Sequence, residues 1–206
     1  MTEEEWLACE APELMLELLQ GKVSDRKLRL LGCWVQYSWL QDLSDARSRV
    51  ALGVSERFAD GLATEAELDD ATHDATEAFR AAVSLYGPED KRVRGAELAL
   101  WAAFPGRAHN KAAVVWTGDE ATAIAYIRDI FGNPFRPITL EPSCVTSTVA
   151  SLARKMYGTR DFSAMPILAD ALMDAGCSNE TILEHCRGPG PHVRGCFAVD
   201  LCLGKK

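Results

Sequence analysis

The sequence has no long apolar runs and is short of positive charge. No stretch approaches the roughly 18 uninterrupted apolar residues that a membrane-spanning helix requires, so we expect no membrane insertion. Lysine and arginine number 22 against 30 aspartates and glutamates, which gives a formal net charge of −8. A chain with this charge repels phosphate backbones as a whole, so we expect no nucleic-acid partner. The opening residues lack the basic start and apolar core of a secretory signal, and we expect a cytoplasmic protein.

Motifs of several common enzyme classes are also missing. The hydrolase GxSxG, the metalloprotease HExxH, the dinucleotide-binding GxGxxG and the phosphate-binding GxxxxGK[ST] patterns do not occur. The seven cysteines form no CxxC pair, and their odd number argues against a disulfide framework and for reduced thiols. We therefore favour a non-enzymatic protein over an enzyme.

Strand signals are nearly absent. No alternating run of β-branched residues is long enough for a strand, and the Asp-Gly pair at 60 and 61 falls at a predicted helix end. Caps and helical periodicity extend over most of the chain instead. We predict an all-α fold, a compact multi-helix bundle of about ten helices, with repeat-like stacking of helical hairpins as an option.

The best-defined predicted helix spans 64–86. Thr64 and Glu67 form a capping box, an apolar stripe includes Leu68 and Phe79, and Gly87 follows its end. Other helix starts are expected at Ser24, with a stripe reaching Val35 and Trp39, and at Ser44, Ala96, Asp119, Ser143, Ala164, at Ser178 or Asn179, and near Val193. Residues 107–118 fit a short strand or a helical turn equally well.

A proline-rich segment separates two helical regions. Prolines 134, 137 and 142 restrict the backbone and disfavour helix, so we expect an extended connector at 134–142. It would join an N-terminal helical region, 1–133, to a C-terminal helical subdomain, 143–206, packed on it within one compact domain.

The most suggestive cluster of chemically active side chains lies near the C-terminus. His185, Cys186, His192 and Cys196 flank a loop of glycines and prolines. Imidazole nitrogen and thiolate sulfur are ligands that zinc accepts in a tetrahedral shell, and iron is the other metal considered. The spacing matches no standard zinc finger, and adjacent residues make awkward joint ligands. Structural histidines and buried core cysteines are therefore the main alternative, and no cofactor is predicted outright.

The same loop, 187–195, also fits an anion site. Arg187, His192 and Arg194 stand among glycines that permit close backbone approach, and two guanidinium groups suit a phosphate or carboxylate. A helix beginning near Val193 would add free amide groups. The alternative is a rigid turn whose arginines pair with neighbouring acids.

Two weaker clusters have ordinary explanations. Asp70, His73, Asp74 and Glu77 share one face of the 64–86 helix, as ligands do in di-iron bundles, but no second ExxH sequence completes such a site. A solvated acidic face is expected. His109, with Arg107 and Lys111 nearby, is expected in a solvent-facing loop.

Several segments form a recognisable set: MTEEEWLAC, SDRKLRLL, RDIFGNPFRP, PILADALMDAGC and ILEHCRGPGPHVRGCFAVDLCLGK. Together they resemble an uncharacterised, multi-copy bacterial family of planctomycete type. The resemblance covers nearly the whole chain and implies one shared architecture, but no activity, catalytic residue or cofactor. LLGCWVQYSW departs from the family's pattern, which is more cysteine-rich and basic there, so the resemblance implies no metal site in that stretch.

The sequence thus leads to one main function and two alternatives. We expect a helical interaction or scaffold protein that binds another protein, including a second copy of itself. The first alternative is a zinc- or iron-binding protein that uses the C-terminal histidines and cysteines. The second is an enzyme or small-anion binder at Arg187, His192 and Arg194.

Overall fold

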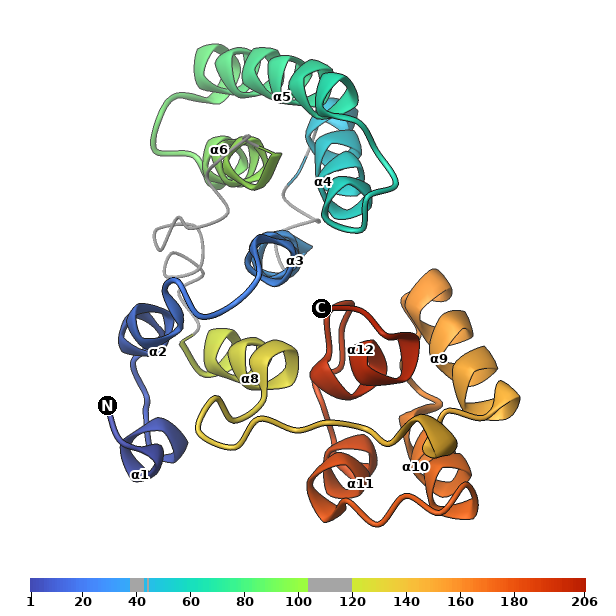
Figure 1. Cartoon of the computed structure of the whole chain (residues 1–206). Helices are drawn as coiled ribbons and strands as arrows, with labels where there is room; N and C mark the ends of the chain where they lie inside the picture. The colour runs from blue at the N-terminus through green and yellow to red at the C-terminus, as the bar shows by residue number, and fades with distance from the viewer. Residues whose placement is uncertain (38–42, 44, 104–119) are drawn as a thin grey trace. The chain divides into compact units, whose positions relative to one another are not determined.

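The fold is all-α, as the sequence predicts. The computed structural model describes residues 1–37, 43, 45–103 and 120–206, and these ranges contain eleven α-helices, one short 3₁₀ helix and no strand (Figure 1). Within those ranges, no helix combines the length and apolar character needed to cross a membrane. Backbone contacts divide the chain into unit 1, Met1–Ala8 with Ile124–Lys206, and unit 2, Cys9–Ala123.

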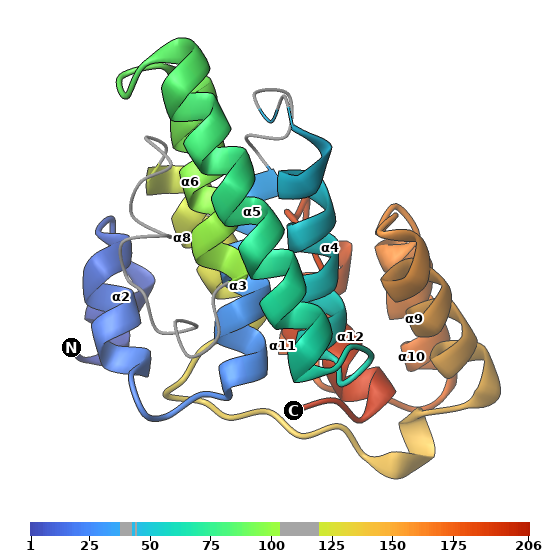
Figure 2. The same cartoon turned by 90° about the horizontal axis from the view of Figure 1, so that it is seen from above.

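Unit 2 is built around four helices that pack against one another. α4 and α6 both lie against α5, and α3 contacts α4 and α6 (Figure 2). Small and aliphatic side chains, among them Leu52, Leu68 and Ala99, fill the space between these helices. The helices of this unit are α2 (Pro12–Leu19), α3 (Asp25–Tyr37), α4 (Ala46–Ala59), α5 (Glu65–Tyr86) and α6 (Lys91–Ala103).

Local capping explains where α5 and α6 begin. The predicted capping box of α5 is present, because the Glu67 N–H donates to Thr64 Oγ1 at 3.2 Å and the Thr64 N–H donates to Glu67 Oε2 at 2.7 Å. The predicted start of α6 at Ala96 is wrong. Asp90 accepts from the Arg92 N–H and pairs with the Arg92 guanidinium, so the helix begins within the charged segment.

Some sequence predictions fall on undescribed residues. Ser44, the expected cap of α4, lies outside the described residues, and the observed cap is Asp45, which accepts from the Arg47 N–H. Trp39 and the 107–118 segment, with Arg107, His109 and Lys111, also lie outside the described residues.

Unit 1 surrounds a separate core. α10 packs on α9 and α11, and α12 packs on α9 and α11, around side chains that include Val149, Leu168 and Ile182. The elements are α1 (Glu3–Leu7), α8 (Glu120–Phe131, which begins just before the unit boundary), η2 (Pro142–Cys144), α9 (Ser147–Thr159), α10 (Met165–Asp174), α11 (Glu180–Arg187) and α12 (Phe197–Leu203).

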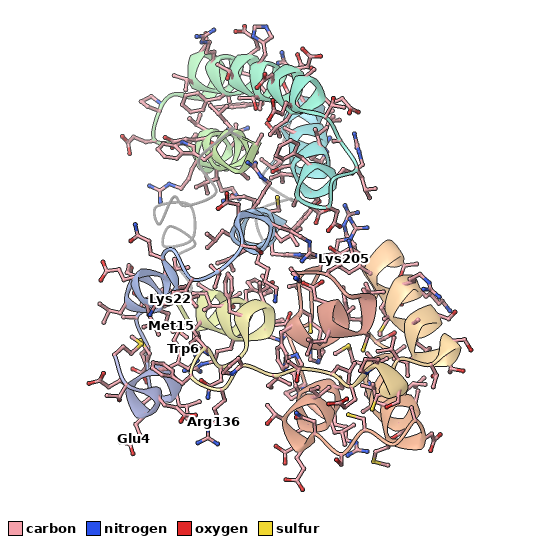
Figure 3. The ribbon with its side chains drawn as sticks, in the orientation of Figure 1. Glu4, Trp6, Met15, Lys22, Arg136 and Lys205 are labelled. Carbon is pink, nitrogen blue, oxygen red and sulfur yellow. The ribbon has the colours of Figure 1, made fainter. Side chains whose placement is uncertain are left out.

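The N-terminal helix α1 belongs to unit 1 through contacts with α8 and the loop after it. Arg128 Nη2 donates to the carbonyls of Trp6 and Leu7 at 3.2 and 2.8 Å. Arg136, labelled with Trp6 in Figure 3, pairs with Glu3, and the Trp6 side chain is buried. These contacts fix the position of α8, which carries the acidic residue of the site described below.

Two predicted starts in unit 1 need correction. The helix expected from Ser143 begins at Ser147, because the Thr146 hydroxyl accepts from the Val149 N–H and a 3₁₀ turn precedes it. The helix expected near Val193 begins at Phe197, so the Val193 amide is not a free helix-terminal donor. The proline-rich segment 134–142 lies inside unit 1, between α8 and η2.

Candidate metal centre

Four side chains from separate segments of unit 1 converge on one point. They are Asp129 in α8, His185 in α11, His192 in the following loop and Cys196 at the start of α12, and one ligand atom from each lies within 4.8 Å of the others. His185 Nε2 is 3.2 Å from Cys196 Sγ and 3.0 Å from Asp129 Oδ1. His192 Nδ1 is also 3.0 Å from Asp129 Oδ1. Ligand atoms around a tetrahedral zinc ion are about 3.3–3.6 Å apart, so small shifts would accommodate a metal ion.

Glycine and proline shape the loop that returns the chain from α11 to this point. α11 ends at Arg187, and Gly190 adopts a φ of +84°, which L-residues with a side chain rarely adopt. A Cβ at Gly190 would stand 3.0 Å from the His192 backbone nitrogen. The glycine therefore permits the tight backbone path that carries His192 back towards His185.

We expect Gly190→Ala to lower the free energy of unfolding of unit 1 by about 1–2 kcal/mol, because alanine is strained at this φ. Denaturant unfolding followed by circular dichroism measures the change. The matched control is Gly158→Ala, since Gly158 lies in α9 and no neighbouring side chain comes within 4 Å of the position that a methyl group would take there. Alanine there should be neutral or stabilising. Equal effects of both substitutions would contradict the role given to Gly190.

The four side chains are largely shielded from solvent. The exposed fractions are 0% for Cys196, 2% for the Asp129 side chain, 8% for that of His192 and 19% for that of His185. A buried carboxylate requires charged or hydrogen-bonding partners. Asp129 Oδ1 faces both imidazoles, and Asp129 Oδ2 accepts from the Val193 N–H at 3.0 Å. The backbone thus fixes the orientation of the carboxylate.

Both ring nitrogens of His192 face oxygen atoms. Nδ1 lies 3.0 Å from Asp129 Oδ1, and Nε2 lies 3.4 Å from the Gly188 carbonyl oxygen. When Nε2 carries the hydrogen and donates to Gly188, Nδ1 presents a lone pair towards Asp129. Two lone pairs in contact need a proton or a metal ion between them. A histidine whose other nitrogen donates to a backbone carbonyl is the usual arrangement around a bound metal.

Cys196 supplies the sulfur of the group. Its burial, reinforced by the neighbouring Asp129 carboxylate, raises the pKa of the Cys196 thiol well above its usual value. The metal-free site therefore contains a protonated thiol, and a metal ion that binds the sulfur displaces this proton.

Cys186, the other thiol of the predicted cluster, does not join this group. It is fully buried in the core of unit 1, where burial raises its pKa to about 12. Successive residues in an α-helix point about 100° apart, so His185 and Cys186 face different surroundings. The structure brings together three of the four predicted ligands and adds Asp129.

The two arginines of the predicted anion site contact other parts of unit 1. Arg187 Nη2 lies 3.4 Å from Asp170 Oδ1 on α10. Arg194 donates to the carbonyls of Tyr157 and Gly158 at the end of α9. His192 instead faces Asp129. These three residues thus have separate partners.

The acidic cluster on α5 lies on a more exposed surface. Asp70, His73 and Asp74 are exposed, and Glu77 pairs with Arg80. Among the described residues, the Asp129 group is the only close set of metal-binding side chains.

A cavity of about 280 Å³ adjoins the centre. Its walls include Asp129, His185 and His192, whereas Cys196 is not among the lining residues. The other lining residues are Ala125, Arg128, Gly188, Pro189, Gly190 and Pro191. The centre is therefore accessible from the side that carries the oxygen and nitrogen donors.

Comparison with protein-family models, with curated proteins and with solved structures finds no match to this chain.

Proposed function

We propose that this protein binds a zinc ion through Asp129, His185, His192 and Cys196. The observation that carries the proposal is the convergence of these four donors, from two helices, a loop and the N-cap of α12, within 4.8 Å of one another. Further support comes from the contacts behind the donors, because Val193 orients Asp129 and Gly188 contacts the far nitrogen of His192. Such supporting contacts are typical of metal ligands.

The mixture of donors favours zinc over other common ions. A thiolate is a poor ligand for magnesium and calcium, whereas zinc takes sulfur, imidazole and carboxylate together. Two histidines and one carboxylate also form the ligand set of non-haem iron enzymes, which makes iron the second candidate. We favour zinc over iron because the buried thiol beside His185, that of Cys196, is a ligand that zinc readily accepts.

The proposed zinc ion would cross-link parts of unit 1 that are distant in sequence. It would join α8 to α11, the loop after α11 and the start of α12. This role fits the scaffold function that the sequence favours, since a metal cross-link would hold a helical surface in one shape for a protein partner. Binding of such a partner is a further part of the proposal.

Metal analysis of the purified protein tests the zinc proposal. We expect about one equivalent of zinc per chain, retained through gel filtration, because four preorganised ligands bind tightly. His192→Ala and Cys196→Ser should each lose most of this metal. The matched control is His73→Ala, which removes an exposed histidine of α5.

Two results would overturn the proposal. One is a wild-type protein that contains no stoichiometric metal and does not bind added zinc more tightly than about 1 µM. The other is full metal content in both site variants. Stoichiometric iron in place of zinc would identify the second candidate ion.

A further inference from the structure

The cavity beside the centre gives one side of a bound metal ion access to small molecules. Asp129, His185 and His192 line it, and Cys196 lies behind them. A zinc ion with four protein ligands can expand to five-coordinate when a further ligand reaches it. The ligand must enter from the cavity, because the Cys196 side is completely buried.

The charges around the cavity favour an anion. A zinc ion bound by one thiolate, one carboxylate and two neutral imidazoles has no net charge. Arg128 then adds one positive charge, and Asp129 is the acidic residue among those that line the cavity. The charge of Asp129 is already counted against that of the metal ion, and its Oδ2 accepts from the Val193 N–H. A loaded site would therefore be positive on the cavity side.

Arg128 is held in a fixed position next to the metal-binding group. Its Nη2 atom donates to the carbonyls of Trp6 and Leu7 at the end of α1, and the residue directly precedes Asp129. A guanidinium group is always charged, and because Nη2 is engaged by these carbonyls, an anion in the cavity would contact the remaining N–H groups of Arg128. Held in this way, it loses little side-chain entropy when an anion binds.

The remaining walls limit the size of the ligand. A volume of about 280 Å³ lies just below the usual range for drug-sized ligands, about 300–1,000 Å³. Ala125, Pro189 and Pro191 provide apolar surface, and the two prolines restrict the loop that forms one wall. The cavity therefore suits an anionic head group with a short apolar part.

We propose that this cavity binds a small oxyanion, which contacts Arg128 and takes the further coordination position on the metal ion. This inference rests on the proposed metal function. The site would recognise the negatively charged oxygen atoms that carboxylates and phosphates share.

The test uses full-length protein loaded with cobalt(II), whose visible spectrum reports its ligands. In a non-coordinating buffer, we titrate the loaded protein with acetate and, separately, with methylphosphonate. We expect a saturable spectral change with at least one of these probes, and the tighter one identifies the class of ligand. Arg128→Gln should weaken this binding about tenfold or more, while Arg128→Lys keeps part of it.

Two further variants make the test specific to the cavity. Ala125→Leu fills the cavity without removing a charge or a ligand, and we expect it to weaken anion binding while cobalt binding is unchanged. Arg154→Gln, at an exposed position on α9, should leave both unchanged. Cobalt binding by each variant also shows that the centre is intact.

The outcomes separate this inference from the metal proposal. If wild-type protein binds neither cobalt nor zinc, both fail. If cobalt binds but neither anion changes the spectrum, or if Arg128→Gln and Ala125→Leu bind the anion as tightly as wild type, the oxyanion inference is overturned and the metal proposal stands.

Discussion

Replacing Asp129 by alanine is expected to lower the free energy of unfolding of unit 1 by about 3–5 kcal/mol, even without metal. The carboxylate is 2% exposed, and both of its oxygens have partners. Its removal leaves two imidazoles without their acidic partner and the buried Val193 amide without an acceptor. Urea unfolding in metal-free buffer, followed by circular dichroism, measures the loss.

Two substitutions separate the causes of this loss. Asp129→Asn keeps the shape and an oxygen that can accept from Val193, so it should be less destabilising than Asp129→Ala while still removing the charge that the histidines and a metal ion need. Asp170→Ala removes an acid whose side chain is 70% exposed, and its effect should stay within about 0.5 kcal/mol. A similarly small effect of Asp129→Ala would show that the Asp129 network does not support the fold.

The local sequence predicts where a helix begins when few neighbouring residues can cap it. Thr64 and Glu67 cap α5 reciprocally, as the sequence predicts. At α11 the sequence leaves Ser178 and Asn179 as alternative caps, and Asn179 is the one that accepts from the Ile182 N–H. Predictions fail where a second cap lies a few residues away. Thr146 competes with Ser143, and Asp90 starts α6 inside a segment whose charges suggest a linker.

The sequence likewise identifies only part of the candidate metal centre. His185, His192 and Cys196 are close in sequence and flank a loop of glycine and proline, so composition alone identifies them. Asp129 comes from α8, and no residue spacing connects it to the loop. Its position in the RDIFGNPFRP motif is the sequence signal that could have identified it. Long-range packing, which a single sequence does not specify, brings α8 to the loop.

His185 joins the metal-binding group and Cys186 does not, and the cause is the geometry of the helix. The sequence places both in the cluster because they are adjacent, but an α-helix turns adjacent side chains apart. His185 faces Asp129 and Cys196, while Cys186 packs in the core. A helical wheel drawn for residues 180–187 puts the two side chains in different directions, so periodicity alone is enough to separate them.

Removing zinc from the loaded protein is expected to lower the melting temperature of unit 1 by about 16–32 °C. Free zinc at about 1,000 times its dissociation constant adds about 4 kcal/mol of stability to the folded state. Unit 1 falls in the size range of about 60–100 residues, in which each kcal/mol shifts the melting temperature by about 4–8 °C. A loss of about 4 kcal/mol therefore corresponds to about 16–32 °C. Thermal unfolding with and without a chelator measures the change.

Two cysteine variants provide a matched comparison for this effect. Cys196→Ala removes a proposed ligand, so its melting temperature should no longer respond to the chelator. Cys186→Ala removes a thiol that is equally buried and lies outside the metal-binding group, so it should lose some stability through packing yet keep the full response. If both variants respond like wild type, Cys196 is not a ligand. If wild type itself is unaffected by the chelator, zinc does not hold unit 1 together.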